Sequence, residues 1–197
     1  MRFLGLTGLG LVGLMSGSLA PAQSSDALVK YSGCKWAGGP DVVETAPLAS
    51  GVHTRTVNTL RGPRSIEMEE GKRVMFAYPG ETFYANVKAE RLPRASYGQE
   101  KAWLIDEYEF ILSGQGDNRR NYALKPRLHG FEMYGLDRSK LEGGVLGVYL
   151  FFDDVHHEVV TIYFLNQDPE KRFQTMPEYE VLRSAFIESY TACLAKP

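Results

Sequence analysis

Hydrophobic and polar residues alternate with two different periods along this chain, and the change of period marks the predicted elements. Within residues 53–90 several short runs have the alternation or the apolar composition of strands, which indicates antiparallel strands with one face in water. The pairs Glu70-Gly71 and Pro79-Gly80 interrupt this pattern and are typical of turns. We therefore predict short strands in "HTRTVNTL", "RSIEME", "KRVMFAY" and "TFYANVKAE".

The apolar spacing becomes helical in two segments, residues 97–113 and 176–194. The first begins at a capping-box pattern, in which Ser96 is followed three positions later by a glutamine. The second begins at Thr175, which is followed three positions later by a glutamate, with a proline in the first turn. The second helix has one apolar stripe, which consists of Tyr179, Leu182, Phe186, Tyr190 and Cys193.

Three further strands are predicted between these helices, at residues 128–136, 144–154 and 157–166. The last two are apolar at both alternating sets of positions, which is typical of central strands covered on both faces. The order of strands, helix, strands, helix predicts an α+β fold, a mainly antiparallel twisted sheet with two packed helices. We expect one such domain over residues 51–197.

The first 22 residues have the pattern of a secretory signal. A basic start is followed by the uncharged run "FLGLTGLGLVGLM" and by small residues, which predicts cleavage before Gln23. A retained anchor is the alternative, but the run is short for a membrane span. The short leader and the absence of an N-x-S/T acceptor indicate a bacterial protein. Residues 23–50 are rich in Ser, Gly, Ala and Pro, so we expect an irregular N-terminal arm.

Two cysteines, Cys34 and Cys193, are the whole cysteine content of the chain. In an exported protein an even pair indicates a disulfide. Closing so long a loop would contribute roughly 5 kcal/mol by the chain-entropy account. Two unpaired core thiols are the alternative.

The charge balance and the absence of common catalytic motifs argue against several classes of function. The formal net charge is −2, and loss of the leader removes Arg2 and no acid, which argues against a nucleic-acid binder. The sequence contains no H-E-x-x-H, P-loop, C-x-x-C or G-x-S-x-G motif. We therefore predict no catalytic residue, no cofactor and no transmembrane segment in the mature chain.

The stretch "FFDDVHHEVV" gathers acids and histidines between the two most apolar strands. If a short turn joins these strands, Asp153 faces Glu158 and Asp154 faces His157, on opposite faces of the hairpin. The polar tip of a hairpin is the main interpretation, and a metal site at Asp154 and His157 is the alternative. Zinc usually needs three or four converging ligands. The outside candidates for a third ligand are His129 and Asp137.

The order of elements resembles the PsbP/Mog1-like group of α/β/α sandwiches. The likeness lies in "GKRVMFAYPGETFYANVKAERLPRASYGQEKAWLIDEYEFIL", a hairpin running into a helix, and in "GVYLFFDDVHHEVVTIYFLN" followed by "EYEVLRSAFIESY". It covers roughly residues 72–194. The resemblance implies a sandwich fold. Members of the group assist photosystems or small GTPases or have no assigned role, so the resemblance implies no specific function. It assigns no functional residue here.

These patterns predict an exported, non-enzymatic accessory or binding protein of the bacterial cell envelope, periplasmic or extracellular. One alternative is a metal-assisted hydrolase that uses the 153–158 hairpin. Another is a carrier of a small apolar ligand, which would need a cavity lined by the central strands. The hydrolase would bring together at least three of Asp153, Asp154, His156, His157, His129 and Glu158.

Overall fold

The computed structural model describes residues 28, 30–34, 41–59, 62–77, 84–112, 119–122, 127–138, 144–166 and 175–196. The predicted signal and the predicted turn at Pro79-Gly80 lie outside these ranges. No helix in the described ranges is long and apolar enough to cross a membrane.

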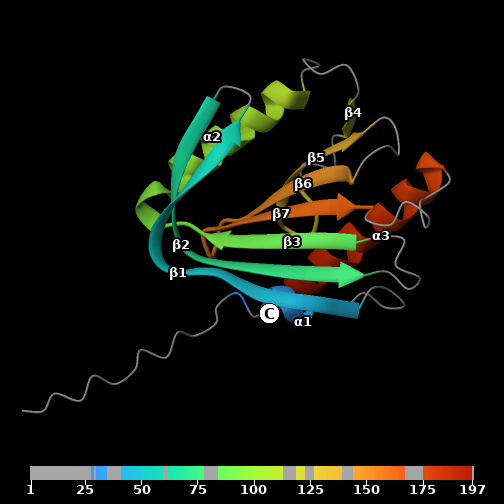
Figure 1. Ribbon diagram of the computed structural model, residues 1–197, viewed down its shortest axis with the longest axis horizontal. Coiled ribbons are helices and arrows are strands. Elements are labelled where there is room, and N and C mark those ends of the chain that lie inside the picture. The colour runs from blue at the N-terminus through green and yellow to red at the C-terminus, as the bar shows by residue number, and fades with distance from the viewer. Residues whose placement is uncertain are drawn as a thin grey trace, which may run out of the picture.

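The described part of the chain forms one seven-stranded antiparallel sheet with helices packed on it (Figure 1). The strand order is β1-β2-β3-β7-β6-β5-β4, so two meanders meet where β3 pairs with β7. This confirms the predicted α+β class. The elements are α1 (Lys30–Gly33), β1 (Asp41–Thr59), β2 (Gly62–Ala77), β3 (Tyr84–Arg91), α2 (Arg94–Leu112), β4 (Arg119–Tyr122), β5 (Glu132–Arg138), β6 (Val145–Asp153), β7 (Glu158–Leu165) and α3 (Met176–Leu194).

Both faces of the central strands are buried, as their double apolar pattern predicts. In β6, Tyr149 and Phe151 pack with α3 and α1, whereas Leu150 and Phe152 pack with α2. Alternating side chains of a strand point to opposite faces, so each face needs its own cover. The larger core lies on the α3 face and the smaller one on the α2 face.

The long hairpin β1–β2 corrects two sequence predictions. Gly71 lies inside β2 and pairs with both Ala49 and Glu90, so the predicted turn at Glu70-Gly71 is wrong. Strand neighbours on both sides hold this glycine extended. Residues 41–50, predicted as part of an irregular arm, instead form the first half of β1. The free end of the hairpin bends toward α2 (Figure 1).

Only one of the two long described helices begins at the capping box that the sequence predicts. The capping box at Thr175 is present and starts α3 as predicted. The one predicted at Ser96 is wrong, because α2 begins earlier, at Arg94. The backbone carbonyl of Pro93 accepts bonds from the Tyr97 amide and the Ser96 hydroxyl, so Ser96 lies within the first turn.

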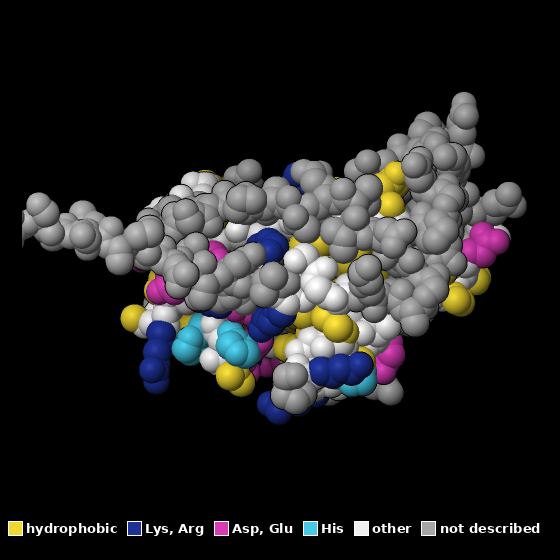
Figure 2. Space-filling view, turned by 90° about the horizontal axis from the view of Figure 1, so that it is seen from below, with side chains coloured by type: hydrophobic (Ala, Val, Ile, Leu, Met, Phe, Trp, Pro, Cys, Tyr) yellow, Lys and Arg dark blue, Asp and Glu magenta, His cyan; other side chains and the backbone are white. Residues whose placement is uncertain are grey.

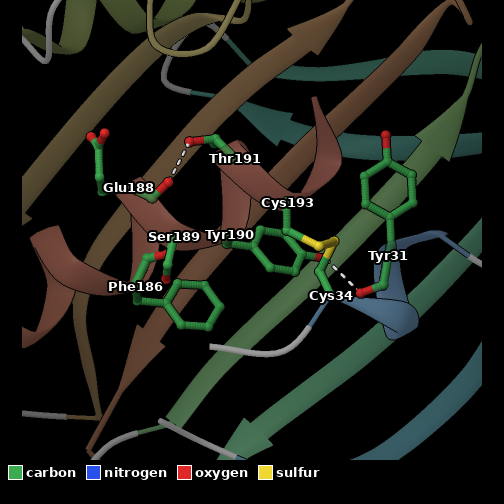
Figure 3. Close-up of a disulfide and its surroundings, with 8 residues drawn as sticks. All are labelled: Tyr31, Cys34, Phe186, Glu188, Ser189, Tyr190, Thr191 and Cys193. Carbon is green, nitrogen blue, oxygen red and sulfur yellow. Dashed lines mark hydrogen bonds between the residues drawn. A yellow bond between two sulfur atoms is a disulfide. The ribbon is translucent and has the colours of Figure 1, made fainter. Parts of the chain in front are cut away.

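The disulfide Cys34–Cys193 is confirmed and joins α1 to α3 (Figure 3). Beside it, the Tyr190 hydroxyl donates a 2.7 Å hydrogen bond to the Tyr31 carbonyl oxygen. Leu28 and Tyr31 are fully buried in the larger core. The short N-terminal segment is thus part of the core and not an appendage.

We expect Cys34→Ser to lower the free energy of unfolding by about 2–5 kcal/mol, because it frees a loop that spans nearly the whole fold. Urea unfolding followed by circular dichroism measures this. Cys193→Ser should give the same loss, and reductant should destabilise only the wild-type protein. Equal stability of Cys34→Ser and oxidised wild type would contradict the prediction.

Candidate functional site

The β6–β7 hairpin tip has the register that the sequence predicts. Asp153 pairs with Glu158, and residues 154–157 form the turn between them. Asp153 Oδ1 accepts hydrogen bonds from the backbone amides of Val155 and His156, both 3.1 Å long, which closes this turn. His157 adopts a left-handed conformation with φ of 57°.

One side of the tip carries a group that we name the Lys30 cluster: Lys30, Asp153, His156 and Glu158. The last three offer ligand atoms that lie within 4.8 Å of one another, as in a metal site. The ammonium of Lys30 lies among them, 2.7 Å from Asp153 Oδ2, 2.9 Å from Glu158 Oε2 and 3.2 Å from His156 Nδ1. A side-chain cation from α1 therefore occupies the position that a metal ion would take.

Glu158 is the buried centre of this charge network, with none of its side chain exposed. Its Oε2 also accepts a 2.7 Å bond from the Tyr31 hydroxyl, and its Oε1 accepts one of 2.7 Å from Arg91. Arg91 reaches on to Glu70 at 3.4 Å. Burial, and then the charge and hydrogen bond of Glu158, raise the pKa of Tyr31. This tyrosine stays a neutral donor.

The pKa of Asp153 reflects the same network. Burial by itself would raise this pKa, but hydrogen bonds from Lys30 and His156 outweigh it and hold the pKa below its ordinary value. The carboxylate is thus charged at neutral pH and fixed by its partners.

The opposite side of the tip is fastened to α2. Lys101 lies 2.8 Å from Asp154 Oδ1 and 2.9 Å from Glu132 Oε2, and the Tyr97 hydroxyl donates to Asp154 Oδ1 at 2.7 Å. Burial would raise the pKa of Asp154, but the bonds from Lys101 and Tyr97 lower it. The His157 ring packs edge-on against Tyr97 at 5.2 Å.

The predicted metal pair is therefore placed apart from the converging ligands. Asp154 binds Lys101 and Tyr97, His157 contacts an aromatic ring, and neither belongs to the Lys30 cluster. A metal role for that pair stays a prediction. Sequence reasoning included Asp153, His156 and Glu158 among the candidates of the hydrolase alternative, and these three do converge. It missed Lys30, which lies 123 positions from Asp153.

The two outside ligand candidates are engaged elsewhere. His129 Nε2 lies 2.8 Å from Glu188 Oε1 on α3. Asp137 is buried and accepts 2.7 Å hydrogen bonds from the hydroxyls of Tyr149 and Tyr179. Arg183, also fully buried, lies 3.0 Å from Asp137 Oδ2.

The Asp137 group fastens α3 to the sheet. Burial raises the pKa of Asp137, and the hydrogen bond from Tyr179, the charge of Arg183 and the hydrogen bond from Tyr149 offset this only in part. A side chain at Gly147 would run into the Asp137 carboxylate and the Tyr179 hydroxyl. The close fit and full burial indicate a packing role, as expected of a charge pair inside a core.

A cavity of about 120 Å³ lies on the other face of the sheet, between the strands and α2. The strands β3, β6 and β7 line it on one side, α2 lines the opposite side, and β2 lines a third side. The lining residues are Ile66, Met68, Lys88, Glu90, Leu92, Leu104, Tyr108, Leu150, Val159, Thr161 and Tyr163.

The turn itself is exposed. Val155 is 81% exposed, and the side chains of Asp154 and His156 are more than half exposed. Figure 2 shows histidine side chains (cyan) gathered beside Lys and Arg side chains (dark blue) on one face of the molecule.

No family model, curated protein or solved structure matches this chain. The resemblance to the PsbP/Mog1-like group stays a prediction.

We expect Lys30→Met to convert the Lys30 cluster into a zinc site, because it removes the cation and leaves three converging ligands. Zinc should bind this variant roughly 10- to 100-fold more tightly than wild type, measured by calorimetry. Zinc should also raise the melting temperature of the variant.

The matched control is Lys30→Met combined with His156→Ala, which removes one ligand and should lose the gain. Wild type binding zinc as tightly as Lys30→Met would show that the ammonium does not occupy the site.

We expect the free energy of unfolding to fall as the pH drops below about 4, since carboxylates with lowered pKa values must be protonated there. Lys101→Met should flatten this dependence, because Lys101 helps to lower the pKa values of Asp154 and Glu132. Urea unfolding across the acid range tests it. Lys196→Met, at an exposed position, is the control and should leave the slope unchanged.

Proposed function

We propose that this chain is an exported, non-enzymatic binding or accessory protein of the bacterial cell envelope. The observation that carries the proposal is the position of the Lys30 ammonium at the centre of Asp153, His156 and Glu158. A catalytic metal needs an open coordination position, and a general base needs a free lone pair. In this cluster, the ammonium of Lys30 fills the central position and engages the lone pairs of the surrounding groups.

The charged groups of the hairpin tip instead connect layers of the fold. Lys30 joins the tip to α1, and Lys101 joins it to α2. The hydrolase alternative would require Lys30 to leave three close partners. It is therefore the less supported interpretation.

Export is supported by the disulfide, because such bonds persist mainly in oxidising compartments. The leader pattern of residues 1–22 points to the same route. A carrier role is a second candidate, which the cavity under α2 favours.

We expect a tagged full-length chain expressed in a Gram-negative host to be cleaved before Gln23 and recovered from the periplasm with Cys34 and Cys193 oxidised. Intact-mass analysis of cell fractions, with and without thiol alkylation, measures all three. A variant lacking residues 3–15 is the control and should stay in the cytoplasm with free thiols. An uncleaved, cytoplasmic wild-type chain would overturn the proposal.

A further inference from the structure

We propose that the cavity under α2 is a binding site for a small neutral molecule, about the size of one six-membered ring, that carries a single hydroxyl group. This inference rests on the proposed role as a binding protein and names its ligand class. The size of the cavity, the polarity of its lining and the elements around it support this assignment.

The volume of about 120 Å³ limits the ligand. Apolar cavities of about 150 Å³ hold one benzene molecule. This cavity therefore accepts a single ring or a chain of about six carbon atoms, which is smaller than most cofactors.

One part of the lining is apolar and firmly placed. Leu92, Leu150 and Val159 are almost fully buried, and Ile66 and Met68 close the side toward β2. All five belong to the smaller core, so packing fixes their positions. An apolar ring or chain would gain roughly 25 cal/mol for each Å² that it removes from water here.

The rest of the lining is polar but electrically balanced. Lys88 Nζ lies 2.7 Å from Glu90 Oε1, so their charges compensate each other. An ionic ligand would bring an uncompensated charge into this half-buried space, which is costly. A neutral ligand is therefore favoured.

Hydroxyl groups provide the polar contacts. Thr161 stands opposite both Lys88 in β3 and Leu150 in β6, so it lies at the border between the polar and apolar parts. Tyr108 and Tyr163 add two phenol groups. Burial, and next the neighbouring Tyr163, raise the pKa of Tyr108, so it remains a neutral donor. One ligand hydroxyl can both donate and accept at this border.

The cavity has a cover that is fastened by its own contact. Arg64, on β2, binds both carboxylate oxygens of Glu100 on α2, at 3.0 and 2.9 Å. Its guanidinium also lies 4.1 Å from the centre of the Trp103 ring. Ile66 and Met68, the next inward positions of β2, line the cavity. The cavity is partly open to solvent, and this contact narrows its surroundings by holding the end of the hairpin to α2, so release of the contact would widen the entrance.

The test uses the processed, oxidised protein with phenol, 1-hexanol, benzene and benzoate as probes, and titrations by NMR with 13C-methyl methionine. We expect phenol to bind saturably with a Kd of about 1 mM or tighter and to shift the Met68 methyl signal. Benzoate should bind at least about tenfold more weakly, because it is charged.

Two variants separate the cavity from other sites. Leu150→Phe fills it and should weaken phenol binding at least about tenfold, whereas Leu182→Phe, a matched change on α3, should not. Thr161→Val keeps the volume and removes the hydroxyl, so it should weaken phenol about tenfold and leave benzene unchanged. The second variant serves if the first does not fold.

The cover has its own measurement. Arg64→Ala should raise the dissociation rate of phenol, seen as faster exchange of the Met68 signal, because the hairpin end is no longer held to α2. An unchanged rate would show that ligands enter elsewhere and would overturn this part of the inference.

The outcomes distinguish this inference from the proposed function. A processed, exported protein that binds none of the neutral probes, or one whose phenol affinity Leu150→Phe leaves unchanged, would overturn the cavity site and leave the function standing. A cytoplasmic, uncleaved protein that binds phenol under α2 would overturn the proposed function and leave the cavity site standing.

Discussion

The structure depends on one constraint: β6 and β7 are apolar on both faces, so the sheet must be covered twice. Phe151 and Phe152 are adjacent, point to opposite faces and are both fully buried. Each face therefore requires its own helical layer. The two acids that follow continue this alternation. Asp153 reaches α1 through Lys30, and Asp154 reaches α2 through Lys101. The β6–β7 hairpin thus requires a helical layer on each face of the sheet, and its two aspartates bind those layers through Lys30 and Lys101.

This arrangement explains how residue types associated with catalysis can serve packing. Removing charges from water is costly, and the attraction between them repays the cost only when hydrogen bonds satisfy the remaining polar atoms. Glu158 meets this condition with bonds from Lys30, Tyr31 and Arg91. Such a network accepts few alternative arrangements, so it fixes where α1 sits against the tip of the β6–β7 hairpin. The cluster around Asp137 does the same for α3.

Local signals predicted the elements that depend on local physics. The start of α3 follows from the capping box at Thr175, and the central strands follow from their two apolar faces. The errors arise from contacts between distant segments. Gly71 has the sequence of a turn but is held extended by β1 and β3. Lys30 carries no local sign of its role, because its partners lie more than a hundred positions away. The cavity likewise exists only once β2, the central strands and α2 meet.

The bond between Cys34 and Cys193 has a consequence for the order in which the molecule is completed. It joins α1 to α3, and every described strand lies between them in the chain. During synthesis α1 emerges first, with Leu28 and Tyr31 still lacking the core that later encloses them. Tyr31 and Lys30 find partners once the β6–β7 hairpin has been made, but the thiol of Cys34 has none until the last helix follows. The first described segment can therefore be joined covalently only after the last described helix has been made, when all the described strands are already present in the chain.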